Sequence, residues 1–177
     1  MGAHVRAAYL HRRSADLRAL LNRMNSWNRD DREELFNLAF IDGKAAQFAK
    51  PDFLREPAAK VRKAMEFLFH GKAPAHVRFE FVAANGERHH LQGLGRAGVA
   101  MLMHLWKPRE YGIWNASVDA GFNVLKVRFN RSASKHIGQA YRERTSALKM
   151  IKQEFNFGSL AETDYFVDAF GKGFLKL

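Results

Sequence analysis

Residues 91–100 are Leu-Gln-Gly-Leu-Gly-Arg-Ala-Gly-Val-Ala, and this stretch constrains the fold more than any other part of the chain. Two glycines flank one leucine directly before an apolar run that is rich in small residues. Glycine permits a tight turn, and the free backbone N–H groups at the start of a helix suit a phosphate oxygen. The stretch therefore predicts a hairpin turn and then a buried helix over 94–106, with Arg96 adding a positive charge at the turn.

Helical periodicity continues upstream of this stretch. Apolar residues repeat at helical spacing over 17–24 and again over 35–39, and we expect Asp30 or Asp31 to cap the second of these helices. A third helix is expected over 57–71, because proline suits a first helical turn and glycine suits a helix end.

Residues 77–82 fit both a helix and a strand. We favour a helix, because the neighbouring segments are helical and an isolated two-stranded hairpin is weak. The alternative is one small β-hairpin over 77–91.

Capping residues predict three more helices downstream. They are a short helix after Asn115, a long helix that opens at Ser132 or Ser134 with an apolar stripe reaching Phe155, and a last one from Ser159, where Glu162 has capping-box spacing. We therefore predict an all-α chain that forms a single helical domain over 1–177, a bundle with the hairpin motif at 91–106.

The chain of 177 residues carries a formal net charge of +11, and that charge is concentrated in two blocks. Met1–Arg29 has a net charge of +5 and Arg88–Lys152 of +9, whereas Asp30–Glu87 has −1 and Gln153–Leu177 has −2. A block at +9 repels itself unless a polyanion neutralises it. The charge therefore predicts an anion-binding face around the hairpin.

Several classes of function lack the residues they need. The chain has no cysteine, which excludes a disulfide framework, a thiolate zinc site and a cysteine nucleophile. No metal-ligand spacing and no phosphate-binding loop motif occur, so we expect no metal and no cofactor. No apolar run is long enough to span a bilayer, and the N-terminus lacks a signal-peptide core, so we expect a cytoplasmic protein with no membrane partner.

Leu91–Arg96 resembles the hairpin of helix-hairpin-helix DNA-binding proteins, which holds a backbone phosphate without reading bases. The resemblance extends to the helix-hairpin-helix DNA glycosylases, because Ile113–Val118 stands at the spacing of their catalytic aspartate segment. Asn115 occupies the position of that aspartate, and Ala97 that of the lysine of bifunctional members. An amide cannot replace a catalytic carboxylate, and alanine offers no amine nucleophile. We therefore expect this chain to be non-catalytic.

Some catalytic alternatives stay open. Asp119, one helical turn after Asn115, is the nearest carboxylate that could serve a divergent DNA glycosylase acting on damaged or modified bases. Trp114 and Asn115 could line a base pocket, or Trp114 could belong to the core and Asn115 cap a helix.

A looser resemblance is to helical accessory modules of prokaryotic restriction and defence proteins. It rests on Gly93-Leu94-Gly95, Pro108 and Tyr111–Asn115. It implies a nucleic-acid-facing module whose chemistry is carried by a partner protein or another domain.

We predict that the chain binds nucleic acid, with DNA favoured, in defence or repair. The predicted DNA contacts are the hairpin, the basic loop after it and the long basic helix over 135–152, with the site residues Gly93, Leu94, Gly95, Arg96, Lys126, Arg128, Arg131, Lys135 and Arg142. We expect Gly93→Asp together with Arg96→Glu to weaken binding severely while leaving the fold intact. The alternatives are the divergent glycosylase and a subunit whose basic face meets an acidic protein.

Overall fold

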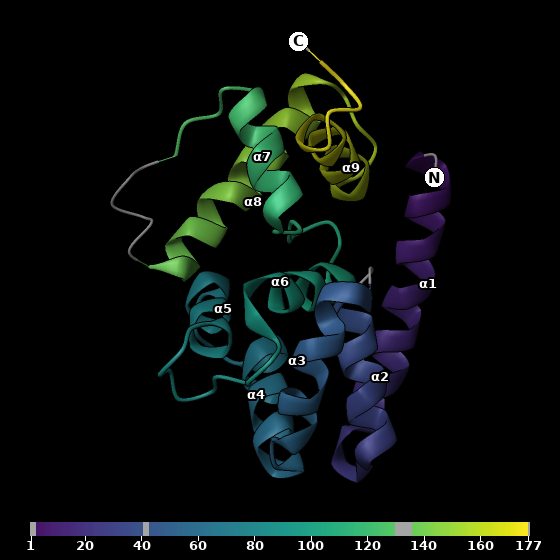
Figure 1. The fold of residues 1–177 in the computed structure, drawn as a ribbon, viewed down its shortest axis with the longest axis vertical. Coiled ribbons are helices and arrows are strands. Elements are labelled where there is room, and N and C mark those ends of the chain that lie inside the picture. Colours follow the sequence, from purple (N-terminus) through teal and green to yellow (C-terminus); the bar gives the residue numbers. More distant parts are fainter. Residues whose placement is uncertain (1–2, 41–42, 130–135, 177) are drawn as a thin grey trace.

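The computed structural model of the chain describes residues 3–40, 43–129 and 136–176, and it omits the side chains of 3–7 and 43–46. These residues form α-helices joined by turns and contain no strand, which confirms the all-α prediction (Figure 1). The elements are α1 Ala3–Asn22, the 3-10 turn η1 Met24–Ser26, α2 Arg29–Ala39, α3 Gly43–Arg55, α4 Ala58–His70, α5 Ala75–Ala83, α6 Gly95–Trp106, α7 Ala116–Val124, α8 Ile137–Glu154 and α9 Leu160–Gly171.

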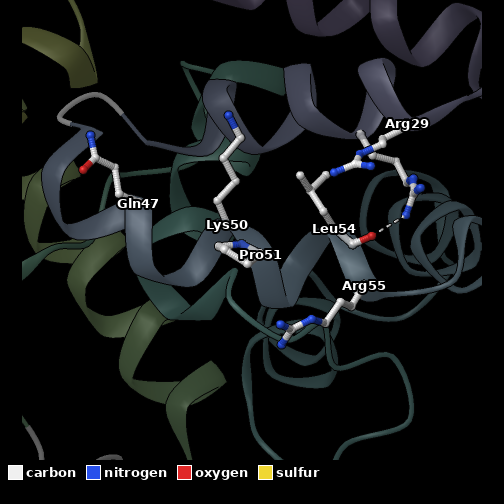
Figure 2. A pocket seen from close by; sticks show the side chains of 7 residues that line it. Arg29, Gln47, Lys50, Pro51, Leu54 and Arg55 are labelled. Carbon is white, nitrogen blue, oxygen red and sulfur yellow. Dashed lines mark hydrogen bonds between the residues drawn. The ribbon is translucent and has the colours of Figure 1, made fainter.

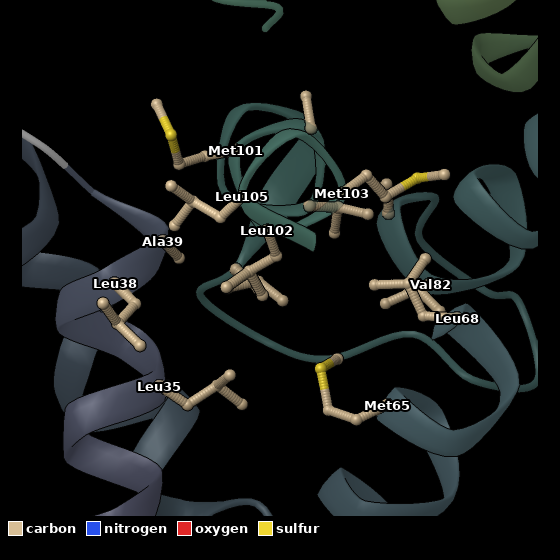
Figure 3. Close-up of a cluster of buried hydrophobic side chains, with 14 of the residues drawn as sticks. Leu35, Leu38, Ala39, Met65, Leu68, Val82, Met101, Leu102, Met103 and Leu105 are labelled. Carbon is tan, nitrogen blue, oxygen red and sulfur yellow. The ribbon is translucent and has the colours of Figure 1, made fainter. Parts of the chain in front are cut away.

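Helix α6 is the centre of the larger hydrophobic core. Every residue from Gly98 to Leu105 is buried, as the uniformly apolar sequence predicted. Helices α1, α2, α4 and α5 pack around it, and Figure 3 shows side chains of α2, α4 and α5 next to those of α6. A helix that is apolar on all sides needs neighbours on all sides, so α6 fixes the positions of the others.

A second, smaller core joins α7, α8 and α9. It is built on Val118, Phe122, Leu148 and Val167. Glycines let α7 and α9 approach closely, because a Cβ atom on Gly121 would lie 1.9 Å from the carbonyl oxygen of Val167. Figure 1 shows these three helices grouped together, with α8 reaching down to α5.

Most predicted helix ends are confirmed. Asn115 Oδ1 accepts the N–H of Val118 at 2.9 Å, and Ser159 Oγ accepts the N–H of Glu162 at 3.2 Å. The cap of α2 was assigned wrongly, because Asn28 precedes the helix and exchanges reciprocal hydrogen bonds with Asp31. Asp31 therefore occupies the third helical position of a capping box, where its carboxylate accepts the backbone N–H of the capping residue Asn28.

Three other expectations need correction or completion. Residues 77–82 are helical within α5, so the favoured alternative holds and the β-hairpin over 77–91 is not formed. Helix α3 was not predicted, because Pro51 lies inside it and interrupts the sequence signal. Helix α8 begins at Ile137 after His136 rather than at either serine, and Phe155 follows its end with 54% of its surface exposed. Ser132 and Ser134 lie outside the described residues.

Candidate nucleic-acid interface

The two hairpin glycines adopt the left-handed backbone conformation that the turn requires. Gly93 has φ +78° and Gly95 has φ +54°, angles that side-chain-bearing residues rarely adopt. Their surroundings differ. A Cβ atom on Gly93 would lie 2.2 Å from the carbonyl oxygen of Ala49 in α3, whereas a Cβ atom on Gly95 would meet nothing within 4 Å. Gly93 thus serves helix packing, and the open approach to the turn is at Gly95.

This packing overturns one expectation. A carboxylate at position 93 would collide with the backbone of α3, so Gly93→Asp would disturb the fold and cannot report on ligand binding. No helix leads directly into the hairpin, because α5 ends at Ala83 and residues 84–94 are non-helical up to the start of α6 at Gly95.

A carboxylate occupies one side of the hairpin. The buried Glu56 accepts the N–H of Gln92 at 3.0 Å and both carboxylate oxygens accept from Lys60 Nζ at 2.8 Å. Burial alone would raise the pKa of Glu56, but these hydrogen bonds and the nearby His90 hold that pKa below its usual value. Glu56 is therefore an internal anion that already accepts a hydrogen bond from the hairpin backbone, and the open approach to the turn is at Gly95.

The lowered pKa of Glu56 predicts a dependence of stability on pH. A carboxyl group with a lowered folded-state pKa stabilises the fold above its ordinary value of 4.5, and that contribution is lost as the pH falls through the lower folded-state pKa. We expect Glu56→Gln to lower the unfolding free energy by about 1–3 kcal/mol at pH 7 and to flatten the decline of stability below pH 4.5.

Urea unfolding at a series of pH values measures this effect. The control is Glu154→Gln, which changes an exposed glutamate that accepts no hydrogen bond within the described part of the chain. Equal acid sensitivity of the wild type and Glu56→Gln would contradict the assignment.

Several predicted site residues are not on the surface. Leu94 is 1% exposed and belongs to the core, so its side chain is not accessible to a ligand at the surface. Trp114 is 2% exposed and stacks with Phe79 and Tyr141, so in this conformation it lines no open base pocket. Asn115 is occupied as the helix cap, as the simpler of the two interpretations predicted.

Asp119 is the centre of a polar cluster that ties α6, α7 and α8 together. One carboxylate oxygen accepts from Arg144 Nε at 2.6 Å, and the other accepts from Trp114 Nε1 at 2.9 Å. Arg96 lies 3.7 Å from that second oxygen and extends over the Trp114 ring, with 4.8 Å between its guanidinium carbon and the ring centroid. These contacts favour a structural role for Asp119 over a catalytic one.

Arg144 was not singled out from the sequence. Its guanidinium carbon lies 4.4 Å from the Trp114 ring centroid and 4.7 Å from that of Phe129, so it joins the hairpin side to the segment after α7. Its spacing is a usable signal, because it follows the buried Tyr141 by three residues and precedes the buried Leu148 by four. An arginine on the inner face of a helix implies a partner within the fold.

Two of the predicted DNA-contacting arginines share a cavity. Arg128, after α7, and Arg142, on α8, line an open cavity of about 410 Å³, and both side chains are exposed. Neither forms an ion pair with any carboxylate in the described ranges. The exposed Lys126 precedes them in a left-handed backbone conformation with φ +55°, while Arg131 and Lys135 lie outside the described residues.

We call five exposed cations together with the turn residue Gly95 the basic face; the cations are Arg96, Lys126, Arg128, Arg142 and Lys149. Asp119 pairs with Arg96 at 3.7 Å and with the less exposed Arg144 at 2.6 Å. The face has an arginine paired with Asp119 at the hairpin end and cations without carboxylate partners in the described ranges at the α8 end. It is suited to an extended anion rather than to a single buried charge.

The described residues contain neither a metal-binding cluster nor a membrane-spanning helix. No group of three or more histidine, aspartate or glutamate side chains there is placed to hold a metal ion. None of the described helices is both long and apolar enough to cross a bilayer.

The likeness to helix-hairpin-helix proteins rests on the residues between 91 and 118 alone, since no protein-family model, curated protein or solved structure matches this chain.

Proposed function

We propose that this protein binds the phosphate backbone of DNA through the basic face and carries no catalytic group of its own for that substrate. The observation that carries the proposal is the continuity of the face. Arg96 and Arg144 both extend over Trp114, Arg144 continues to Phe129, and the adjacent Arg128 opens onto the cavity shared with Arg142. Cations in this arrangement suit successive phosphates along a strand.

The open approach at Gly95 supports the same proposal. Helix α6 has no side-chain cap, so the backbone N–H groups of its first turn remain available beside Arg96. A phosphate oxygen there would gain both these donors and the positive end of the helix dipole. Base recognition has no comparable support, because the aromatic side chain expected to contact a base is buried.

Binding of a fluorescent duplex, measured by anisotropy over a range of salt concentrations, tests the proposal. We expect the affinity to fall steeply with salt, because each neutralised phosphate releases counterions. Arg128→Glu with Arg142→Glu should weaken binding at least about tenfold and reduce the slope of log K against log salt by about 2.

A matched control separates specific contacts from net charge. Lys63→Glu with Lys72→Glu makes the same change in charge at exposed positions in and just after α4, away from the basic face. This variant should lose much less affinity than the face variant. Equal losses in the two variants, or binding that does not respond to salt, would overturn the proposal.

A further inference from the structure

A second cationic site lies outside the basic face, in the part of the sequence whose net charge is close to zero. The cavity between α2 and α3 has a volume of about 510 Å³ and is lined by Arg29, Arg32, Gln47, Lys50, Pro51, Leu54 and Arg55. Four of these seven residues are cationic and none is acidic. Figure 2 shows Pro51 and Leu54 between the basic side chains of the two helices.

Arg32 is held in place before any ligand arrives. Its Nη1 donates to the carbonyl oxygens of Leu54 at 3.1 Å and Glu56 at 2.7 Å, and its Nε donates to the carbonyl of Asn28 at 3.4 Å. These carbonyls include orphan acceptors at the end of α3, which explains why an arginine is partly buried there. No hydrogen bond from Nη2 to any described residue is formed, so this fixed cation keeps donors for a ligand.

The other cations differ in how firmly they are paired. Arg29 is exposed and forms no ion pair within 4.0 Å in the described ranges. Lys50 donates to Glu33 at 2.5 Å in a partly buried pair, with the Lys50 side chain 28% exposed and that of Glu33 44% exposed. Arg55 pairs with Asp52 at the rim, where both side chains are more than half exposed. Exposed ion pairs contribute little, so Arg55 can turn toward a more highly charged anion, whereas Lys50 has to exchange Glu33 for it.

We propose that this cavity binds a small ligand that carries a diphosphate group. Two or more phosphates match its size and its several separated cations better than one phosphate does, and arginine donors fit phosphate oxygens in pairs. The site is distinct from the basic face and does not rest on the proposed DNA binding.

Phe48 offers a way to distinguish a nucleoside diphosphate from inorganic pyrophosphate as the ligand. It is 88% exposed and follows Gln47 on α3, three residues before Pro51, so it stands beside the cavity rim. A nucleoside diphosphate could place its base against this ring, whereas inorganic pyrophosphate could not.

Titration calorimetry with pyrophosphate, ADP and sulfate tests the proposal. We expect saturable binding of pyrophosphate and ADP at micromolar to submillimolar concentration, with sulfate much weaker. Arg29→Gln with Lys50→Gln should weaken pyrophosphate binding at least about tenfold, because two charge-assisted contacts are lost. Arg18→Gln with Lys63→Gln, at exposed positions elsewhere, should leave binding unchanged.

Two further comparisons make the outcomes decisive. If Phe48→Ala weakens ADP but not pyrophosphate, the ligand is a nucleotide; if it weakens neither, the diphosphate alone is recognised, and both results support the site. Failure of both compounds to bind at millimolar concentration would overturn it, as would equal binding by the cavity and control variants. Duplex affinity of the cavity variant should stay within about twofold of wild type, which keeps this test separate from that of the basic face.

Discussion

Gly121→Ala is expected to destabilise this protein by about 3 kcal/mol or more, equivalent to a fall in melting temperature of roughly 6–12 °C. The added Cβ atom would lie 1.9 Å from the carbonyl oxygen of Val167 and 2.7 Å from its carbonyl carbon. Both atoms belong to the backbone of α9, so no side-chain rotation relieves the contact. The two helices would have to separate and open the smaller core.

Thermal unfolding followed by circular dichroism measures this effect. Gly171→Ala tests the same contact from the other helix, because its Cβ atom would lie 1.9 Å from the carbonyl oxygen of Ser117. Gly158→Ala is the matched control, since its nearest contact is a side-chain oxygen of Glu162 at 3.1 Å rather than a backbone atom of a neighbouring helix. A melting temperature of Gly121→Ala equal to that of Gly158→Ala would show that α7 and α9 do not pack as described.

Asp119→Ala is expected to lower the unfolding free energy by about 2–4 kcal/mol, because it leaves a partly buried arginine without its counter-ion. The side chain of Asp119 is 24% exposed and that of Arg144 is 18% exposed, so water replaces their contact only in part. Removal of the Asp119 carboxylate also takes away the ion-pair partner of Arg96. Under the proposed function, Arg96 is then less well positioned and duplex binding should weaken.

A double-mutant cycle with Arg144→Met isolates the interaction. We expect a coupling energy of at least about 1 kcal/mol between Asp119 and Arg144, measured by urea unfolding. Asp119→Asn should fall between the wild type and the alanine variant, because the amide oxygen can still accept from Trp114. A variant more stable than wild type would instead indicate a strained functional carboxylate, as the glycosylase alternative requires.

Local sequence patterns were sufficient for most of the helices and for their caps. The apolar run of α6 could only be a buried helix, and Asn115 and Ser159 mark helix starts through hydrogen bonds that span three residues. Such interactions lie within one helical turn, so neighbouring residues contain the information. Helix α3 shows where local patterns fail, because Pro51 disfavours a helix locally, whereas packing against α2 stabilises one.

The candidate sites depended much more on contacts between distant residues. Charge counting located the basic face, since net charge is a property of sequence, but it missed the cavity between α2 and α3, where acidic neighbours cancel the count. The sequence pattern of the hairpin also did not distinguish Gly93, which packs against α3, from Gly95, where an added Cβ atom would meet nothing within 4 Å.

Composition and periodicity alone were enough to establish an all-helical chain with an excess of positive charge around residues 88–152, because both are properties of short stretches. The burial of Trp114, the pairing of Asp119 with Arg144 and the convergence of Arg29, Arg32 and Lys50 on one cavity were decided by the tertiary fold. Each joins residues from different helices, and which helix faces meet depends on the packing of the whole core around α6.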